Sequence, residues 1–591
     1  MRILFLCHGF NSLTQRLYAE LAARGHEISV EFDIHDSVTE EAVALWRPEV
    51  ILAPFLKRAI PSSVWRAHRC LVVHPGIPGD RGPSSLDRAI QEGESRWGVT
   101  VIEATGEMDA GAVWASQDFE MRAAAKGGIY RREVTEAAVR SVLIALERME
   151  GGVFRPALPE PAAPGATGRF RPLMKQPERA IDWTRDSCET VLRRIRAADG
   201  APGVLDSLCG QAVFLYDAHP EDSLSGGAPG TVIATRGGAI LRATVDGAVW
   251  IGHLKIDSGE DPARGLPAIK LPATMVLGER LSAVPESVAP LWDESGMRSF
   301  RDIRYEEKNA VGVLHFCFYN GAMSTEQCRR LAEAIRFARS RPTRVIVLAG
   351  GADFWSNGIH LGVIEASAAP AEESWANINA IDDVALEILG CDRQLTLAAL
   401  QGNAGAGGVF LALAADRVLA RRGVVLNPHY RNMGNLYGSE YWTYTLPRRV
   451  GPEAAAAIMR NRLPLGAPQA AACGLIDGVL DLDAPAFLDR VAADAQALAG
   501  SSDFDSLLAG RQARRAADEV VKPLARYRTE ELEHLRRNFH GFDPSYHVAR
   551  YNFVFKVPRS RTPLYLAKHR ATCDAGCDAG MASQSRIRQQ V

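Results

Sequence analysis

The sequence predicts a multidomain α/β protein, and three observations lead to this prediction. The chain has 591 residues, a length that accommodates three or four domains rather than one. Strand-like and helix-like runs alternate in roughly its first 150 residues and again from about residue 300, which is typical of parallel sheets covered by helices. Between these two regions, short β-like runs recur between turns.

A Rossmann-like first domain is expected over residues 1–165. Its strand-like segments are Ile3–Leu6, Ile28–Phe32 and Glu49–Ala53, and its first helix-like segment is Leu13–Arg24. Residues 155–168 are rich in Pro, Ala and Gly, which is the composition of a linker. From 166 to 285 the short β-runs predict a small β-barrel domain. These runs are Gln211–Tyr216, Gly230–Ala234, Ala239–Val245 and Val249–Lys255.

A second α/β domain is expected over residues 286–545. Its clearest elements are the buried-strand candidates Val311–Phe316 and Arg344–Ala349 and the charged helical stretch 510–540. The segment Ser324–Ser340 has the pattern of an amphipathic helix, with Ser324 as its N-cap. Residues 546–591 are expected to form a C-terminal extension whose polar end is disordered.

The composition excludes several classes of protein. With 68 Lys and Arg against 70 Asp and Glu, the net charge is −2, so no strong basic field is available for nucleic acid or anionic lipid. No apolar run reaches the roughly 18 residues that a membrane span needs. The ten cysteines are scattered, as reduced thiols of a cytoplasmic protein are. Cys573 and Cys577 lack two further ligands at suitable spacing, so no metal is expected.

The first candidate site lies in the Rossmann-like domain. His74 ends the strand-like run Leu71–His74, and open α/β sheets bind their ligands at the carboxyl ends of strands. Arg81-Gly82 follows in a turn-rich loop, Thr100 lies in the next strand, and Asp109 comes in the loop after it. These residues, in this order, resemble the tetrahydrofolate-dependent formyltransferase family, whose fold also continues with a β-barrel after a linker.

The resemblance implies formyl transfer from 10-formyltetrahydrofolate. His74 would move a proton between nucleophile and leaving amine, Asp109 would orient the imidazole, and Arg81 and Thr100 would support them. Where the family has Asn two residues before the His, this chain has Val72, which cannot donate to an oxyanion. The alternative reading is that His74 caps a strand end and Asp109 fixes a turn.

The second candidate site combines two glycine-containing loops, Gly351–Leu361 and Gly402–Gly408. They resemble the oxyanion loops of the crotonase (enoyl-CoA hydratase/isomerase) family. By that resemblance the backbone N–H groups of Ile359 and Gly407 would polarise a thioester C=O. His360 replaces the family's usual Asp.

The acids that a crotonase usually carries have been moved. Phe410 stands where the first catalytic Glu is usual, Tyr430 falls near the second, and Glu440 is new. Because Glu440 lies among aromatic residues, its pKa is expected to be raised by desolvation, with Tyr430 as its hydrogen-bond partner. The alternative reading is that Glu440 caps the helix after Gly438-Ser439. His360 and His429 are interpreted as supporting groups.

A formyltransferase fused to such a crotonase domain resembles one family closely, the hydrogenase maturation factors HypX/HoxX. The motifs that carry the resemblance are Asn427–Tyr430, Gly438–Trp442, Tyr551–Pro558 and Thr562–Arg570. The resemblance implies that formyl passes from 10-formyltetrahydrofolate to coenzyme A, and that formyl-CoA is split into CO and CoA. The CO would become the iron ligand of a [NiFe]-hydrogenase, whose precursor or maturation proteins are then candidate partners.

The residues alone indicate only folate-dependent formyl transfer and acyl-CoA chemistry. Three alternatives therefore stay open. The chain formylates a sugar or an amine and carries a degenerate crotonase module; it hydrolyses formyl-CoA to formate, with Glu440 activating water; or it is a non-catalytic chaperone for a hydrogenase precursor.

Overall fold

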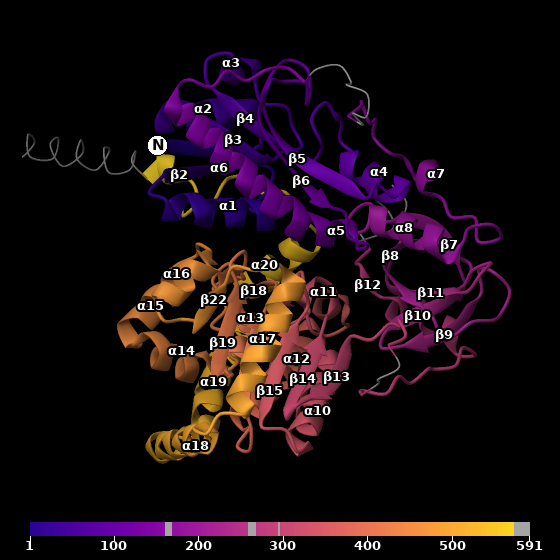
Figure 1. The fold of residues 1–591 in the computed structure, drawn as a ribbon, viewed down its shortest axis with the longest axis vertical. Coiled ribbons are helices and arrows are strands. Elements are labelled where there is room, and N and C mark those ends of the chain that lie inside the picture. The colour runs from indigo at the N-terminus through magenta and orange to yellow at the C-terminus, as the bar shows by residue number, and fades with distance from the viewer. Residues whose placement is uncertain (160–167, 258–267, 293–295, 572–591) are drawn as a thin grey trace, which may run out of the picture. The chain divides into compact units, whose positions relative to one another are not determined.

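The computed structural model describes residues 1–159, 168–257, 268–292 and 296–571, and the chain divides into two compact units. The first unit holds Met1–Lys175 together with the segment from Pro558 onward, and the second holds Gln176–Val557. Both are α/β structures (Figure 1), which confirms the predicted fold class. Cys573, Cys577, the polar end of the chain and most of the expected linker lie outside the described residues.

The first unit is built on a six-stranded sheet of order β2-β1-β3-β4-β5-β6. Its strands are β1 (Arg2–Cys7), β2 (Glu27–Phe32), β3 (Val50–Phe55), β4 (Cys70–His74), β5 (Arg96–Glu103) and β6 (Val113–Glu120). Its helices are α1 (Ser12–Ala23), α2 (Asp36–Trp46), α3 (Ser62–Trp65), α4 (Ser85–Glu92), α5 (Lys126–Ile129) and α6 (Thr135–Gly151), with a π-helical turn at Tyr130–Val134 between the last two.

The prediction of a parallel sheet is correct for β1 to β4 and wrong for β5 and β6, which are antiparallel. In the pairing of β4 with β5, His74 lies opposite Thr100 and Leu71 opposite Glu103. The connection between β4 and β5 therefore stays at the carboxyl end of β4 and does not return to the other end of the sheet. Its one helix, α4, has only 8 residues. A parallel neighbour needs a longer crossover.

The end of the described chain completes this first unit. Residues 562–570, here called the C-terminal segment, lie along the edge strand β2 (yellow in Figure 1), where Val30 N–H donates to Leu566 O at 2.9 Å. The fully buried carboxylate of Glu31 accepts hydrogen bonds from His569 Nε2 at 3.0 Å and from Arg570 at 2.7 Å. An edge strand that would otherwise expose unpaired backbone groups is thereby covered.

The second unit begins with an antiparallel sheet of order β7-β8-β11-β10-β9, with β12 paired to β11. Its elements are α7 (Gln176–Arg179), α8 (Cys188–Ala198), β7 (Val204–Leu208), β8 (Gln211–Glu221), β9 (Val232–Arg236), β10 (Ala239–Ala243), β11 (Ala248–Ile256), β12 (Leu271–Pro272) and α9 (Ala273–Leu277). Helices α8 and α9 pack on the sheet over a shared apolar core. No pairing joins β7 to β9 among the described residues, so closure into a barrel stays a prediction.

The rest of the second unit contains a six-stranded sheet of order β13-β14-β15-β17-β19-β22 and a small sheet of order β16-β18-β20-β21. The strands are β13 (Ile303–Lys308), β14 (Val311–Phe316), β15 (Val345–Gly350), β16 (Phe354–Ser356), β17 (Leu395–Leu400), β18 (Asn403–Gly405), β19 (Arg417–Arg421), β20 (Val425–Asn427), β21 (Leu465–Gly466) and β22 (Gly478–Leu480). The helices are α10 (Thr325–Ser340), α11 (Leu361–Ala366), α12 (Pro370–Leu389), α13 (Gly407–Leu413), α14 (Trp442–Val450), α15 (Pro452–Arg460), α16 (Ala467–Ala472), α17 (Ala484–Ala499), α18 (Phe504–Val521), α19 (Leu524–His540) and α20 (Ser545–Val554).

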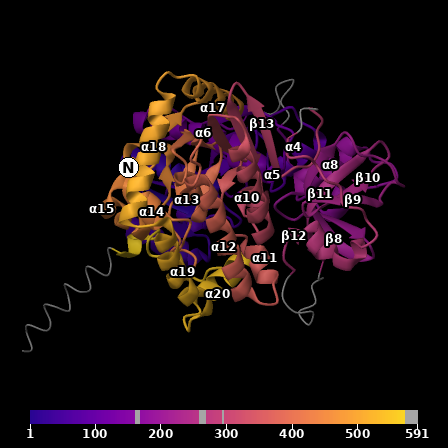
Figure 2. The same ribbon diagram turned by 90° about the horizontal axis from the view of Figure 1, so that it is seen from below.

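Helices cover both faces of the larger sheet (Figure 2). Leu348 and Leu400 join the core formed with α10, α12 and α13, whereas Val347 and Leu397 join the core formed with α17 and α18. This alternation follows from the two-residue period of a strand and explains why the strands read as continuous apolar runs. The predicted N-cap Ser324 is confirmed, since its side chain accepts from Gln327 N–H in a capping box.

Candidate active sites

The first site is built at the end of β4, where His74 is almost fully buried between two carboxylates. Its Nδ1 lies 3.6 Å from Asp109 Oδ1, and its Nε2 lies 3.3 Å from Asp80 Oδ2. Asp109 has a left-handed backbone conformation, with φ at 57°, and its other oxygen accepts from Gly82 N–H at 3.1 Å. The structure therefore brings together the predicted pair and fixes Asp109 to the loop beside Arg81.

Asp80 is the residue that the sequence reasoning missed. Its carboxylate is fully buried, and its Oδ1 accepts from Arg171 Nε at 2.7 Å. Ser85 donates a hydrogen bond to the oxygen that faces His74. Its position in the loop Gly79–Gly82, just after a strand end, could have marked Asp80 as a candidate site residue. Its buried partner Arg171 lies far along the chain, and no sequence pattern links the two.

The other predicted residues of this site have structural contacts. Thr100 Oγ1 donates to Gly76 O at 2.8 Å, which anchors the loop that follows His74. Arg81 pairs with the exposed Glu107. Val72 lies in β4 opposite Ile102, so it supplies no hydrogen-bond donor to this site.

In the second site, the two loops expected to form an oxyanion hole converge. A methyl group on Gly358 would lie 3.5 Å from Gly407 N, so the chain at Ile359 and the start of α13 are close neighbours. Among the described residues, nothing accepts a hydrogen bond from Ile359 N–H or Gly407 N–H. Both groups are therefore available to a bound carbonyl oxygen.

Glu440 lies directly against this helix start. A methyl group on Gly407 would come within 1.9 Å of Glu440 Oε1, so a larger residue there would displace the Glu440 carboxyl. Tyr430 Oη donates to Glu440 Oε2 at 2.5 Å, and Ser439 N–H donates to the same oxygen at 3.2 Å. Gly438 is equally constrained, because a methyl group there would lie 2.0 Å from the Tyr430 ring.

Burial raises the pKa of Glu440 to about 8, and the nearby charge of Asp382 adds to this rise. The hydrogen bond from Tyr430 opposes it, because it stabilises the ionised carboxylate. The pKa of Tyr430 is itself raised well above its usual value, chiefly by burial and then by Glu440. The tyrosine therefore stays protonated and acts as a donor.

A polar cluster lies beneath Glu440 and was also missed in the sequence. Asp382 of α12 accepts from Glu440 N–H at 2.8 Å, and Glu531 of α19 accepts from Tyr441 N–H at 3.1 Å and Thr443 N–H at 2.8 Å. The free N–H groups at the start of α14 are thus satisfied by Glu531, and Glu440 does not act as their cap. A carboxylate within the apolar stripe of α12 was the available signal for Asp382.

Aromatic rings occupy the position of the missing acid. Phe410 is fully buried and stacks on Tyr430 with ring centroids 5.4 Å apart, and its ring lies 6.4 Å from that of Trp442. An apolar ring here leaves Glu440 as the carboxylate that lies against Gly407. It also removes polar surface that would hold a water molecule.

The two histidines named as supporting groups are held neutral. His360 Nδ1 accepts from Val363 N–H at 3.1 Å and so caps α11. Burial lowers the pKa of His360 to about 4. Burial also lowers the pKa of His429 to about 4, and the positive charge of Arg462 adds a smaller contribution. Neither is the partner of Glu440.

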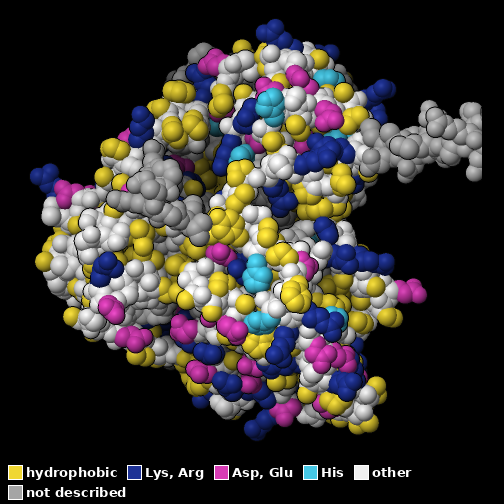
Figure 3. Space-filling view, turned by 180° about the vertical axis from the view of Figure 1, so that it is seen from behind, with side chains coloured by type: hydrophobic (Ala, Val, Ile, Leu, Met, Phe, Trp, Pro, Cys, Tyr) yellow, Lys and Arg dark blue, Asp and Glu magenta, His cyan; other side chains and the backbone are white. Residues whose placement is uncertain are grey.

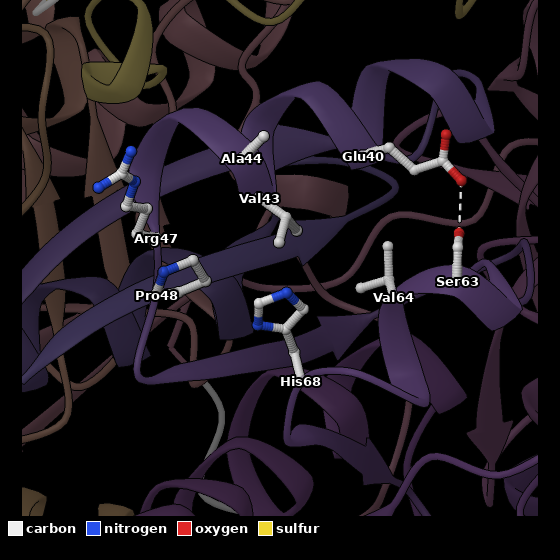
Figure 4. Close-up of a pocket in the computed structure, with 8 residues that line it drawn as sticks. All are labelled: Glu40, Val43, Ala44, Arg47, Pro48, Ser63, Val64 and His68. Carbon is white, nitrogen blue, oxygen red and sulfur yellow. Dashed lines mark hydrogen bonds between the residues drawn. The ribbon is translucent and has the colours of Figure 1, made fainter.

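The first unit also has a hollow apart from the His74 site. It has a volume of about 560 Å³ and is formed by α2, α3 and their flanking loops (Figure 4), and its lining includes Glu40, Arg47 and His68 but not His74.

In the described parts of the chain, no three His, Cys, Asp or Glu side chains are placed to hold a metal ion. Within the same residues, no helix has the length and apolarity to cross a bilayer. Figure 3 shows acidic and basic side chains interspersed on the face drawn.

Comparison with known proteins assigns both halves of the chain. The family model "Formyl transferase" matches residues 30–145, "Formyl transferase, C-terminal domain" matches 173–263, and "Enoyl-CoA hydratase/isomerase" matches 306–540. The methionyl-tRNA formyltransferase of Paraburkholderia phymatum is 28% identical over 254 residues, which are 42% of this chain and 70% of that protein. The chain therefore joins a region similar to formyltransferases to a region similar to crotonases.

Two relatives match the whole arrangement. The hydrogenase maturation factor HoxX of Bradyrhizobium diazoefficiens is 54% identical over 587 residues, covering 99% of this chain and 100% of that protein. The crystal structure of HypX from Aquifex aeolicus in complex with tetrahydrofolic acid is 50% identical, with a TM-score of 0.92 over 96% of this chain and 99% of that one. The chain belongs to the HoxX/HypX family of hydrogenase maturation factors, which confirms the predicted family.

Proposed function

We propose that this protein makes the CO ligand of a [NiFe]-hydrogenase. It transfers formyl from 10-formyltetrahydrofolate to CoA at the His74 site and splits formyl-CoA into CO and CoA at the Glu440 site. Membership of the hydrogenase maturation family supports the destination of the CO. The tetrahydrofolic acid bound by the Aquifex relative supports folate as the formyl carrier. Both reactions take place in the cytoplasm, and a hydrogenase precursor or maturation protein receives the CO.

In the first step the CoA thiol attacks the formyl carbon on N10 of the folate. A C–S bond forms, the C–N bond breaks, and the thiol proton moves to N10. His74 carries this proton, since a neutral imidazole is a base toward the thiol and its protonated form is an acid toward the amine. Asp109 and Asp80 on its two nitrogens stabilise the charged imidazolium between the two transfers.

In the second step formyl-CoA loses its formyl hydrogen as a proton to the Glu440 carboxylate. The C–H electron pair becomes the lone pair of CO, and the C–S electrons leave with sulfur. Glu440 then returns the proton to the thiolate, so atoms and charge balance. The N–H groups of Ile359 and Gly407 hold the formyl oxygen meanwhile.

The observation that carries this proposal is the environment of Glu440. The residue is 1% exposed, and its carboxyl is hydrogen-bonded to Tyr430 and lies against Gly407. Desolvation makes it a stronger base than an ordinary glutamate. The same burial and the Phe410 ring disfavour a water molecule beside it, which favours CO release over hydrolysis to formate.

The test supplies the purified protein with 10-formyltetrahydrofolate and CoA and measures CO, tetrahydrofolate and formate. We expect CO and tetrahydrofolate in equal amounts, no CO without CoA, and little formate. Formate in place of CO would identify a formyl-CoA hydrolase. Tetrahydrofolate release that needs an amine or sugar instead of CoA would identify another formyltransferase. No turnover at all would favour the chaperone.

A further inference from the structure

Three side chains beneath Glu440 form a continuous polar chain, here called the carboxyl chain. It consists of Glu531 on α19, Ser439 in the loop before α14, and Asp382 on α12. Ser439 Oγ lies 3.1 Å from Glu531 Oε2 and 2.8 Å from Asp382 Oδ2. All three side chains are fully buried.

The geometry at Ser439 requires a proton on one of the carboxyl groups. A serine hydroxyl has one hydrogen to donate, yet both neighbours of Ser439 Oγ are carboxyl oxygens. If both carboxyls were ionised, Ser439 Oγ would face one of the two carboxylate oxygens without a hydrogen between them. If one carboxyl is protonated, it donates to the hydroxyl, and the hydroxyl donates to the other.

The charges around the chain assign that proton to Glu531. Arg528 Nε lies 3.7 Å from Asp382 Oδ2, whereas no Lys, Arg or His among the described residues comes within ion-pair distance of Glu531. Burial raises the pKa of Glu531 to about 8 and that of Asp382 to about 6, and Arg528 limits the second rise. Among the described residues, the other titratable or charged groups that interact with these carboxyls include Tyr430, Tyr437 and Tyr441 in the loop, Cys328 on α10, Glu440 itself, and Asp383 on α12.

The carboxyl chain also determines where Glu440 points. Glu440 and Tyr441 both have left-handed backbone conformations, with φ at 58° and 57°, which non-glycine residues rarely adopt. Asp382 holds the Glu440 N–H and Glu531 holds the Tyr441 N–H. The two ends of the chain therefore stabilise the strained turn that directs the Glu440 carboxyl at Gly407.

We propose that Glu531 carries a proton and donates it as a hydrogen bond to Ser439, which donates in turn to ionised Asp382, and that this chain positions Glu440 for proton transfer. A neutral Glu531 leaves one negative charge beside Glu440 instead of two, so Glu440 can still ionise and act as the base. The three are positioning residues. The inference rests on the decarbonylation proposed above, although the proton on Glu531 can be tested without it.

The first test is infrared spectroscopy of the full chain in a Glu440→Gln background, which removes the buried carboxyl whose pKa is raised as far as that of Glu531. At pH 7 we expect the C=O band of a protonated carboxylic acid, and we expect Glu531→Gln to remove it. The matched control is Glu530→Gln, the neighbouring α19 glutamate that pairs with Lys522 and Arg526, which should keep the band. Absence of the band in the background variant, or its persistence after Glu531→Gln, would overturn the assignment.

The second test uses Ser439→Ala, which interrupts the carboxyl chain without altering either carboxyl. With synthetic formyl-CoA we expect kcat for CO release to fall at least about tenfold and KM to change little, because Glu440 loses its support. The midpoint of the pH profile should also move. Glu530→Gln should match the wild type, and thermal melting verifies that both variants are folded. If Ser439→Ala keeps the kcat and pH profile of the wild type, the positioning role is contradicted. If the wild-type protein itself makes no CO, the proposed function is refuted, whereas the infrared test of the proton on Glu531 still holds.

Discussion

At the scale of single residues, both candidate sites depend on carboxyl groups whose surroundings give them different tasks. Asp109 and Asp80 flank one imidazole and are each tied to the surrounding loop or to a buried arginine. Glu440 has no cationic partner among the described residues and is enclosed by aromatic rings and other carboxyls. The first arrangement places a carboxylate beside each nitrogen of a histidine, and the second raises the basicity of a glutamate.

His74→Ala should abolish tetrahydrofolate release from 10-formyltetrahydrofolate in the presence of CoA, because the imidazole that passes the thiol proton to the leaving amine is gone. Synthetic formyl-CoA should still yield CO at the wild-type rate, which serves as the control for folding. Near-normal tetrahydrofolate release, measured by absorbance, would show that His74 is only a strand cap.

Glu440→Gln should leave folate turnover intact but produce little CO, so that formyl-CoA or its hydrolysis product formate accumulates. Tyr430→Phe should be impaired less severely, because it removes a hydrogen bond and leaves the base. Gas-phase CO and thioester analysis of the same reaction distinguish these outcomes. CO at the wild-type rate from Glu440→Gln would rule out this mechanism.

The pH dependence of CO release should report the raised pKa of Glu440. The ionised form is the base, so kcat/KM for formyl-CoA should rise about tenfold per pH unit below the pKa of about 8 and level off above it. Tyr430→Phe removes a hydrogen bond that favours the ionised form, so its midpoint should move to higher pH. A flat profile between pH 6 and 8, or a shift to lower pH in the variant, would contradict this assignment.

The sequence was sufficient for residues whose chemistry sits in a short motif. Gly407 opens a helix just after a strand, and Tyr430 and Glu440 lie in a loop rich in glycine and aromatic residues; loops and helix starts at strand ends are where ligands often bind. Asp382 and Glu531 reach the same place from helices far along the chain. Their contacts depend on how α12 and α19 pack, and no local pattern encodes that packing.

At the scale of elements, most strands and helices were predictable from apolar periodicity, as β14, β15 and α10 illustrate. The direction of β5 was not, because periodicity reports which face of a strand is buried and is silent on which way the strand runs. The small strands β7 and β12 were missed for a related reason. They are short, and only the two end residues of β7 are buried and neither residue of β12 is, so their apolar pattern is weak.

The C-terminal segment offers a test of an element rather than a residue. A chain ending after Val557 should lose at least about 3 kcal/mol of the free energy of unfolding of the first unit, because Glu31 would lose its hydrogen bonds from His569 and Arg570 and β2 would lose the segment that covers its edge. Folate turnover should fall with it. A chain ending after Ala571 is the matched control and should melt like the full protein; equal melting of the two truncated chains would refute the role of this segment.

At the scale of the whole molecule, the two reactions are connected by the one substrate they share. CoA is the acceptor in the first and the leaving group in the second, so its long pantetheine arm suits a carrier of the formyl group. Calorimetry on the full chain should show CoA binding tighter than about 1 mM, or roughly −4 kcal/mol. No detectable heat at millimolar CoA would count decisively against both steps.

The pairing of Val30 and Glu31 with residues 562–570 has a consequence for how this protein is made. The hydrogen bond from Phe32 N–H to Thr562 Oγ1 joins residues 530 positions apart. A ribosome adding about 5–20 residues per second therefore needs roughly half a minute to two minutes to supply the partner of β2 after β2 has emerged. The nascent first unit spends that time with an unpaired edge strand and with Glu31 lacking its partners, so it reaches its final form only after residues 562–570 have been translated.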